Sequence, residues 1–331
     1  MNLHCIAIPT PFPVGPVNVY LLDSPEPTLV DVGPNTEEAM AALRAGLDAY
    51  GHALADIRHL VITHAHPDHY GLAARVVAES GAQVYSHQYN SARLANSQAE
   101  AERQRAYYAR VLQQANVPLS ILAGLEGELS SATRYAQPVT VDVALNDGDV
   151  LTLAGSPWEI IHTPGHARGH ICLYHRASGD LLSGDHLLRD ISSNPILEPP
   201  LPGETKRPHS LAQYLHSLRR VAALDVSVAW PGHGAPITDH RQLIAQRMRF
   251  HRQRAEEIAA ILSEGPRTAF EIATILFSEL QGMQVFLAVS EVIGHLDILE
   301  EEGRVISKQE EGRLCYALSA AALCRGVQEA D

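Results

Sequence analysis

Three histidines and one aspartate stand within six positions of the chain, in the segment HAHPDH at residues 64–69. The apolar run IRHLVIT at residues 57–63 precedes them and predicts a buried strand. A solvated turn, a helix cap and a metal site would each account for so many titratable groups at a strand end. His64 and His66 alternate along extended chain, so their rings can converge from one side, whereas Asp68 and His69 enter a new turn. The spacing therefore offers two sets of metal ligands.

Three further polar side chains end apolar strands later in the chain, each directly after a glycine. His166 ends TPGH, Asp185 ends LLSGD, and His233 ends WPGH. Glycine lets the backbone turn tightly and present the next side chain at the mouth of a strand. Core histidines do not explain this recurrence, so we interpret the whole set as a metal centre.

In order and spacing, residues 15–240 resemble the metallo-β-lactamase superfamily. The resemblance implies an α/β fold, a four-layer αβ/βα sandwich in which two mixed sheets face each other and the metals lie at their shared edge. It also assigns ligands to two metals. One metal takes His64, His66 and His166, the other takes Asp68, His69 and His233, and Asp185 bridges them together with a water or hydroxide.

The chemistry follows from these ligands. Imidazole and carboxylate suit zinc, and also manganese or iron, so we expect two divalent cations with zinc as the first assignment. Two cations about 3.5–4 Å apart lower the pKa of a shared water and polarise the bond under attack. We therefore expect hydrolysis of a carboxylic ester, a lactone or an acyl thioester, with Asp68 and Asp185 as the catalytic carboxylates. A small-molecule substrate with an apolar acyl part is the expected partner.

Other branches of the superfamily supply the alternatives. An aspartate at position 185 argues against a true β-lactamase, and His66 stands where flavin-linked diiron reductases of this fold have a carboxylate. Cleavage of a phosphodiester in single-stranded RNA needs the same hydroxide and is the main alternative. Glyoxalase II and the persulfide dioxygenases keep similar ligands, although the basic glutathione-binding residues of glyoxalase II do not map onto this acidic C-terminal third.

Three residues are weaker candidates for a role beside the metals. Asp31 ends PTLVDVG, where members of the superfamily place a carboxylate that orients a metal-binding histidine; the alternative is a turn former. Tyr20 and Tyr85 either approach the substrate or are half-buried strand residues. The remaining histidines are interpreted as solvated or structural, and His186 is singled out because it adjoins Asp185.

Composition sets the class of protein. The chain has 331 residues, 46% of them hydrophobic and 19% charged, which predicts a sizeable core in one large or two ordinary domains. A formal net charge of −13 makes a large phosphate-binding face a local exception. The four cysteines form no CxxC pair, which excludes a thiolate zinc site and a disulfide framework. No signal peptide or membrane-spanning run of about 20 apolar residues is evident, so we expect a cytoplasmic protein without membrane contact.

The order of predicted elements divides the chain into a catalytic domain, residues 1–238, and a C-terminal domain, residues 239–331. Strands alternate with helices in the first half, where NTEEAMAALRAGLDAYG predicts a helix capped by Asn35 and PDHYGLAARVVAESG predicts a helix with Pro67 in its first turn. A helical insertion at about 87–135 interrupts the strands. Its apolar residues, among them Tyr107, Tyr108, Ile121 and Leu122, either cover an acyl group or pack the insertion onto the sandwich.

Three helical patterns and a hairpin, RVISKQEEGRLCYALS, follow residue 239 and predict a winged helix. A metallo-β-lactamase domain with this addition resembles the β-lactamase-like 2 group, whose members have been linked to RNA cleavage and whose relatives act on acyl thioesters. The helix that would enter a groove, LAVSEVIGHLDILEEEG, has acidic residues and no Lys or Arg. We therefore expect it to pack against the catalytic domain or to form a homodimer, and we do not expect nucleic-acid binding.

Overall fold

The computed structural model describes residues 2–95 and 98–322, which form two compact units. The first unit comprises the described residues up to Ala101, Ser131–Ser193 and His216–Ile244. The second comprises Glu102–Ser130, Asn194–Leu215 and the described residues from Ala245 onwards. These units divide the chain differently from the predicted domains, and the predicted boundary between residues 238 and 239 stays a prediction. Residues 1, 96–97 and 323–331 of the predicted segments lie outside the described residues.

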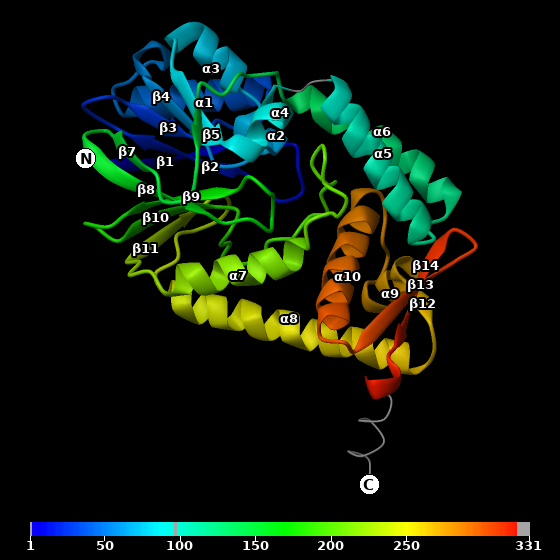
Figure 1. Cartoon of the computed structure of the whole chain (residues 1–331). Coiled ribbons are helices and arrows are strands. Elements are labelled where there is room, and N and C mark those ends of the chain that lie inside the picture. Colours follow the sequence, from blue (N-terminus) through cyan, green and yellow to red (C-terminus); the bar gives the residue numbers. More distant parts are fainter. Residues whose placement is uncertain (1, 96–97, 323–331) are drawn as a thin grey trace. The chain divides into compact units, whose positions relative to one another are not determined.

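Two mixed sheets form the centre of the first unit (Figure 1). The first sheet has the strand order β1-β2-β3-β4-β5-β6, with β3 to β6 parallel to one another. Its strands are β1 (Leu3–Ile8), β2 (Val17–Leu22), β3 (Thr28–Val30), β4 (His59–Ile62), β5 (Gln83–His87) and β6 (Val143–Leu145). The second sheet has the order β11-β10-β9-β8-β7 and is antiparallel except for the pair β10–β11. Its strands are β7 (Val150–Leu153), β8 (Ser156–His162), β9 (Ile171–His175), β10 (Asp180–Gly184) and β11 (Val228–Pro231).

Alternation along the strands builds two cores on opposite faces of the first sheet. Leu60 and Ile62 of β4 belong to the core that includes Leu43 and Leu47 of helix α1 (Glu37–Ala49). Val61, between them, belongs to a separate core with residues of the second sheet, because successive strand side chains point to opposite faces. The two sheets therefore face each other, and a helical layer covers the first sheet. The predicted sandwich is confirmed.

The helices of the first unit agree with the predicted order but differ at their ends. Thr36, not Asn35, caps α1, because the Thr36 side chain accepts a hydrogen bond from the amide of Ala39 at 3.1 Å. The single helix predicted after Pro67 is two helices, α2 (Pro67–Tyr70) and α3 (Ala73–Ser80). Gly71 separates them where a Cβ atom would lie 2.2 Å from the carbonyl oxygen of Tyr135. The short elements of this unit are η1 (Leu54–Asp56), which precedes β4, and η2 (Gln88–Asn90), α4 (Ser91–Leu94) and η3 (Thr133–Tyr135), which follow α3.

Helix α7 (Ser210–Ala222) runs from the second unit into the first. In the first unit its residues Leu218 and Val221 are fully buried, and its Ser217 hydroxyl donates a hydrogen bond to the carbonyl oxygen of Pro164 at 2.9 Å. Arg220 donates to the carbonyl oxygen of His162 at the end of β8. This half of α7 therefore supports the loop that leads from β8 towards His166.

The second unit has a helical core and a small sheet. Its helices are α5 (Gln98–Gln114) and α8 (His240–Ser263), which both begin in the first unit, α6 (Leu119–Ala132), α9 (Ala269–Leu276) and α10 (Met283–Glu301). The sheet has the order β12-β14-β13, with strands β12 (Arg267–Thr268), β13 (Val305–Glu310) and β14 (Arg313–Leu318). Three helices and a terminal hairpin were predicted here and are observed, while the winged-helix classification stays a prediction.

The aromatic residues of the predicted insertion pack within the second unit. Tyr107 and Tyr108 of α5 are 5% and 7% exposed, and they share one core with Phe286 and Val289 of α10. The rings of Tyr108 and Phe286 lie 4.7 Å apart at 61°. These two aromatic side chains therefore belong to the core of the second unit. Their packing does not support either expectation, that they cover an acyl chain or that they attach the insertion to the sandwich.

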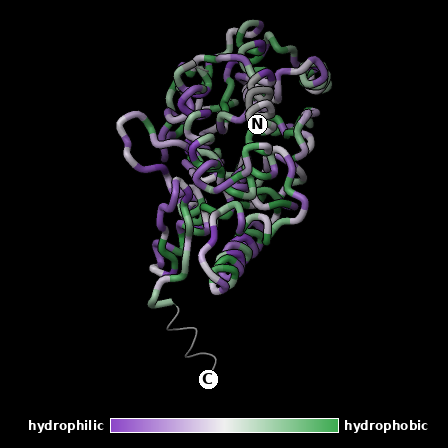
Figure 2. The backbone as a smooth tube through the Cα atoms, turned by 90° about the vertical axis from the view of Figure 1, so that its right-hand side faces the viewer, coloured by the Kyte–Doolittle hydropathy of each residue, from purple (hydrophilic) through white to green (hydrophobic). Residues whose placement is uncertain are grey.

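The acidic residues of α10 are engaged within the second unit. Asp297 receives two hydrogen bonds from Arg207, at 2.7 and 2.5 Å, and Glu291 lies 3.2 Å from Arg254. These ion pairs lie within the second unit, so the expected packing of the helix against the catalytic domain and the expected homodimer stay predictions. None of the described helices combines the length and the hydropathy needed to cross a membrane. Hydrophilic and hydrophobic stretches alternate along the backbone (Figure 2).

Candidate metal centre

Strand ends and one short helix bring the predicted site residues together in the first unit. His64 follows β4, and His66 is still extended, with φ −97° and ψ 142°. Pro67 then begins α2, which carries Asp68 and His69. The other three residues follow β8, β10 and β11, whose ends reach the same edge from the second sheet. All seven predicted residues fall into groups whose ligand atoms lie within 4.8 Å of one another.

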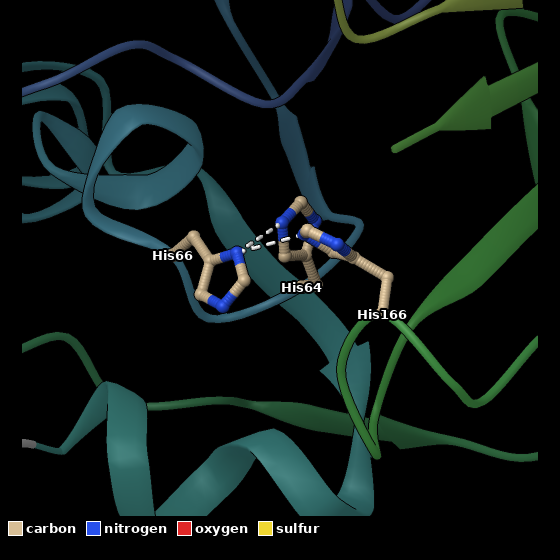
Figure 3. Close-up of side chains that lie close together, drawn as sticks. All are labelled: His64, His66 and His166. Carbon is tan, nitrogen blue, oxygen red and sulfur yellow. Dashed lines mark hydrogen bonds between the residues drawn. The ribbon is translucent and has the colours of Figure 1, made fainter. Parts of the chain in front are cut away.

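The first group is a triangle of ring nitrogens. Nδ1 of His66 lies 2.9 Å from Nε2 of His64 and 2.9 Å from Nε2 of His166 (Figure 3). Thr63 Oγ1 donates to Asp31, so it accepts from Nδ1–H of His64 at 3.0 Å and leaves Nε2 of His64 as a lone pair. At most one proton can lie between each pair of these nitrogens. A cation among them would satisfy all three.

The second group surrounds Asp185. Its Oδ1 lies 3.4 Å from Nε2 of His69, and its Oδ2 lies 3.5 Å from Nε2 of His166 and 3.7 Å from Nε2 of His233. Asp68 Oδ2 approaches the same nitrogen of His233 at 3.4 Å. The carboxylate of Asp185 therefore stands between histidines of both predicted ligand sets.

Asp31 holds two parts of the site in place, the ring of His69 and the backbone at Thr63. Its Oδ2 accepts from Nδ1 of His69 at 2.8 Å and from the Thr63 hydroxyl at 2.8 Å, while its Oδ1 accepts from the Thr63 amide at 2.8 Å. Its backbone is left-handed, with φ 61°, a conformation that aspartate adopts more readily than most residues. The hydrogen bond agrees with the predicted orienting role of Asp31.

His170 supports Asp185 and was missed in the sequence. Its Nδ1 lies 2.8 Å from the hydroxyl of Thr163, and its Nε2 accepts a hydrogen bond from the backbone amide of Asp185 at 3.0 Å. Its ring is fully buried. The only available signal was a second histidine four positions after His166, which does not by itself separate this role from a structural histidine.

A family model described as "Metallo-beta-lactamase superfamily" matches residues 12–233, and one described as "Metallo-beta-lactamase-like, C-terminal domain" matches residues 255–318. The chain belongs to the metallo-beta-lactamase superfamily.

Relatives extend this metallo-beta-lactamase assignment over almost the whole chain. The protein named "Probable metallo-hydrolase YqjP" from Bacillus subtilis is 39% identical over 316 residues, which cover 95% of this chain and 97% of that protein. A metallo-beta-lactamase family protein from Thermus thermophilus has a crystal structure with a TM-score of 0.82 and 32% identity, covering 96% of this chain and 98% of that one. An atrochrysone carboxyl ACP thioesterase from Aspergillus fumigatus is 26% identical over 119 residues, 36% of this chain and 34% of its own. The predicted family and enzyme class, a metallo-hydrolase, are confirmed.

The metallo-beta-lactamase site fits bound cations because several of its buried polar atoms lack a hydrogen-bond partner among the described residues. His69 Nε2, Asp185 Oδ1 and His233 Nε2 are buried without a hydrogen-bond partner among the described residues. A buried polar atom of this kind costs free energy unless something satisfies it. Nδ1 of His69 faces Asp31, and Nδ1 of His233 donates to the carbonyl oxygen of Pro16 at 2.8 Å. The other nitrogen of each ring therefore points at the carboxylates.

The protonation states of the site histidines also favour the binding of cations. Burial and the neighbouring histidines hold the pKa of His64 well below its ordinary value, so its lone pair is available. Burial opposes charge at His69, but the carboxylates of Asp185 and Asp31 outweigh it and raise the pKa of His69 well above its ordinary value. The site therefore combines neutral imidazole with a position where positive charge is stabilised.

The site is open to solvent on one side, as the exposure of its residues shows. His66 and Asp68 are half-buried, while His64, His69, His166, Asp185 and His233 are buried. The open side of the site is therefore at His66 and Asp68. Tyr20 and Tyr85, predicted either to approach the substrate or to be half-buried, are both buried in the core between the sheets. The Tyr20 hydroxyl donates to the carbonyl oxygen of Pro231 at 2.6 Å and so fixes the strand end before His233.

Proposed function

We propose that this metallo-hydrolase holds two divalent cations, zinc by first assignment, and hydrolyses a carboxylic ester or acyl thioester. His64, His66 and His166 would hold one cation, Asp68, His69 and His233 would hold the other, and Asp185 would touch both. The observation that carries the proposal is the carboxylate of Asp185, which lies 3.4–3.7 Å from histidine nitrogens of both sets. When bound, such a pair lowers the pKa of a water molecule between them and polarises the carbonyl under attack.

The chain's own residues supply orientation and proton handling. Asp31 holds His69 through Nδ1, and His170 holds the backbone of Asp185, so both side chains are fixed before substrate arrives. Burial opposes ionisation of Asp185, but His69 and the other histidines outweigh it and hold the pKa of Asp185 well below its ordinary value. Asp68 is the half-buried carboxylate, so its Oδ2 can accept a proton and exchange it with solvent.

The thioester assignment draws support from two observations. One relative has a name that describes a thioesterase acting on an acyl carrier protein. The net charge of −13 and the paired acidic residues of α10 disfavour a long phosphate backbone as substrate. RNA cleavage is therefore not proposed and serves as an outcome of the test.

The test is a substrate panel on the full chain loaded with zinc. Acyl thioesters, esters, lactones, a chromogenic phosphodiester and short single-stranded RNA are assayed side by side at low and moderate salt. We expect thioester or ester hydrolysis with weak salt dependence, abolished in Asp185→Asn and retained in Asp190→Asn, a control at an exposed carboxylate. RNA cleavage that falls steeply with salt, without ester hydrolysis, would overturn the proposal.

A further inference from the structure

A second cluster of side chains borders the candidate metal centre, at the carboxyl ends of β5 and β8. His87 ends β5 in the first sheet and His162 ends β8 in the second. Their rings stack 4.0 Å apart at 16°, so the two sheets meet here. Tyr89, two residues after His87, is 42% exposed, and its amide donates to Nδ1 of His87 at 3.1 Å. The ligand assignments above leave this cluster without a role.

Two hydrogen bonds fix the loop that links His166 to His170 against the cluster. Asn90 Nδ2 donates to the carbonyl oxygen of Gly169 at 2.8 Å, and His162 Nε2 lies 2.7 Å from the carbonyl oxygen of Arg168. A Cβ atom at Gly169 would lie 2.2 Å from Oδ1 of Asn90, so a larger residue here would displace the Asn90 side chain. The loop that carries His166 is therefore rigidly placed beside the Tyr89 segment.

Arg168 is the residue that this loop presents outwards. Every other residue from Gly165 to His170 is buried, whereas Arg168 is half-buried. Its guanidinium carbon lies 5.9 Å from the centre of the Tyr89 ring. A cationic side chain two positions from His166 is thus held by an exposed aromatic ring.

We propose that Arg168, positioned by Tyr89, binds an anionic group of the substrate beside His166 of the metal centre. This inference rests on the proposed ester or thioester hydrolysis and names its substrate class, an acyl compound that carries a phosphate or carboxylate. The anion sits either on the leaving thiol or on the acyl part. Arginine suits both because its planar donors match the oxygens of either group.

Matched substrates test the proposal on the zinc-loaded full chain. Acetyl-coenzyme A carries phosphates on its thiol, the succinyl thioester of N-acetylcysteamine carries a carboxylate on its acyl part, and the acetyl thioester of N-acetylcysteamine is neutral. In Arg168→Gln we expect KM to rise about 10- to 100-fold for one of the anionic substrates, with little change in kcat. The neutral thioester should be unaffected, and the anionic substrate that responds identifies which side carries the charge. Tyr89→Leu should cause a smaller rise in KM for the same substrate.

The control is Arg176→Gln, since Arg176 lies 5.6 Å over the Tyr174 ring in the same way but beyond the opposite end of β9. Equilibrium binding of free coenzyme A and of succinate, followed by calorimetry, separates this inference from the hydrolytic proposal. If no thioester is hydrolysed but Arg168→Gln weakens binding of one probe about 10-fold or more, the proposed hydrolysis is wrong and the proposed anion site stands. If neutral thioester is hydrolysed and no anionic probe or substrate responds to Arg168→Gln, the anion site is overturned. Equal losses in Arg168→Gln and Arg176→Gln would also overturn it.

Discussion

Asp31 Oδ2 lies 2.8 Å from Nδ1 of His69 and determines that Nε2 of this ring faces Asp185. In Asp31→Asn the side chain keeps its shape but loses its charge, so the ring is held less firmly. We expect the affinity for the more weakly held zinc to fall about 10- to 100-fold, as measured by competition with a chromophoric chelator. Asp23→Asn, which removes a carboxylate paired with His4 on β1, should leave the affinity unchanged. Equal affinities in Asp31→Asn and the parent protein would show that Asp31 is only a turn former.

Gly232 allows the close approach of Asp185 and His69. A Cβ atom at this position would lie 2.4 Å from Oδ1 of Asp185 and 2.8 Å from Cε1 of His69. Gly232→Ala should therefore displace the carboxylate and lower kcat/KM by about 100-fold, because a shift of about 1 Å in a reacting group costs this much. Zinc-loaded variants are compared by ester hydrolysis and by thermal unfolding. Gly124→Ala, at a helical glycine with open space around it, is the control and should keep full activity. Full activity in a folded Gly232→Ala protein would contradict the geometry.

Tyr108 separates a packing role of the insertion from a role in substrate binding. Its ring is 7% exposed and packs against Phe286, so Tyr108→Ala should lower the free energy of unfolding by about 3–5 kcal/mol. Denaturant unfolding measures this loss. The dependence of kcat/KM on acyl chain length should stay as in the parent protein. A flattened chain-length dependence with unchanged stability would restore the predicted acyl cover.

The histidine pair His251 and His295 makes the stability of the second unit depend on pH. Nδ1 of His251 lies 3.2 Å from Nε2 of His295. Burial, with help from His295, Arg247 and Arg254, lowers the pKa of His251 to about 3, and burial lowers the pKa of His295 to about 4. Because both folded-state pKa values are depressed, their contribution to stability is complete above the ordinary value of 6.5 and is lost as pH falls below it.

The free energy of unfolding should therefore decrease between about pH 6.5 and 5 with a slope of about 1.4 kcal/mol per pH unit for each proton that only the unfolded chain binds. His251→Gln removes one of these protons and should flatten the slope by about that amount. Chemical denaturation at a series of pH values gives both slopes. Parallel curves for the variant and the parent would contradict the buried neutral state of His251.

The sequence predicts the candidate metal ligands better than it predicts the residues that hold those ligands in place. His64, His166 and Asp185 each follow an apolar strand, and the family resemblance implies that these strand ends meet at the shared edge of the two sheets. His170 has no such signal, because its role depends on the amide of Asp185, 15 residues further along the chain. Asp31 was predicted through the family resemblance, because its partners Thr63 and His69 stand 32 and 38 residues further along the chain.

The insertion and the helix after Pro67 show the same limit in the fold. The amphipathic pattern around Tyr107 shows that one face is buried, but it does not identify the residues that cover it, which are those of α10. Position 71, at the end of α2, needs glycine because the carbonyl of Tyr135, far along the chain, lies where a side chain would be. Periodicity carries no information about such distant contacts.

The metal content of the purified chain tests the central claim most directly. Elemental analysis of zinc-saturated, desalted protein should give about two ions per chain, as in other two-metal sites. His233→Ala removes a residue proposed for only one cation and should give about one ion per chain, while the remaining zinc is still held by the His64, His66 and His166 group. Saturation of the parent protein at one ion or none, with His233→Ala unchanged, would contradict the dinuclear site.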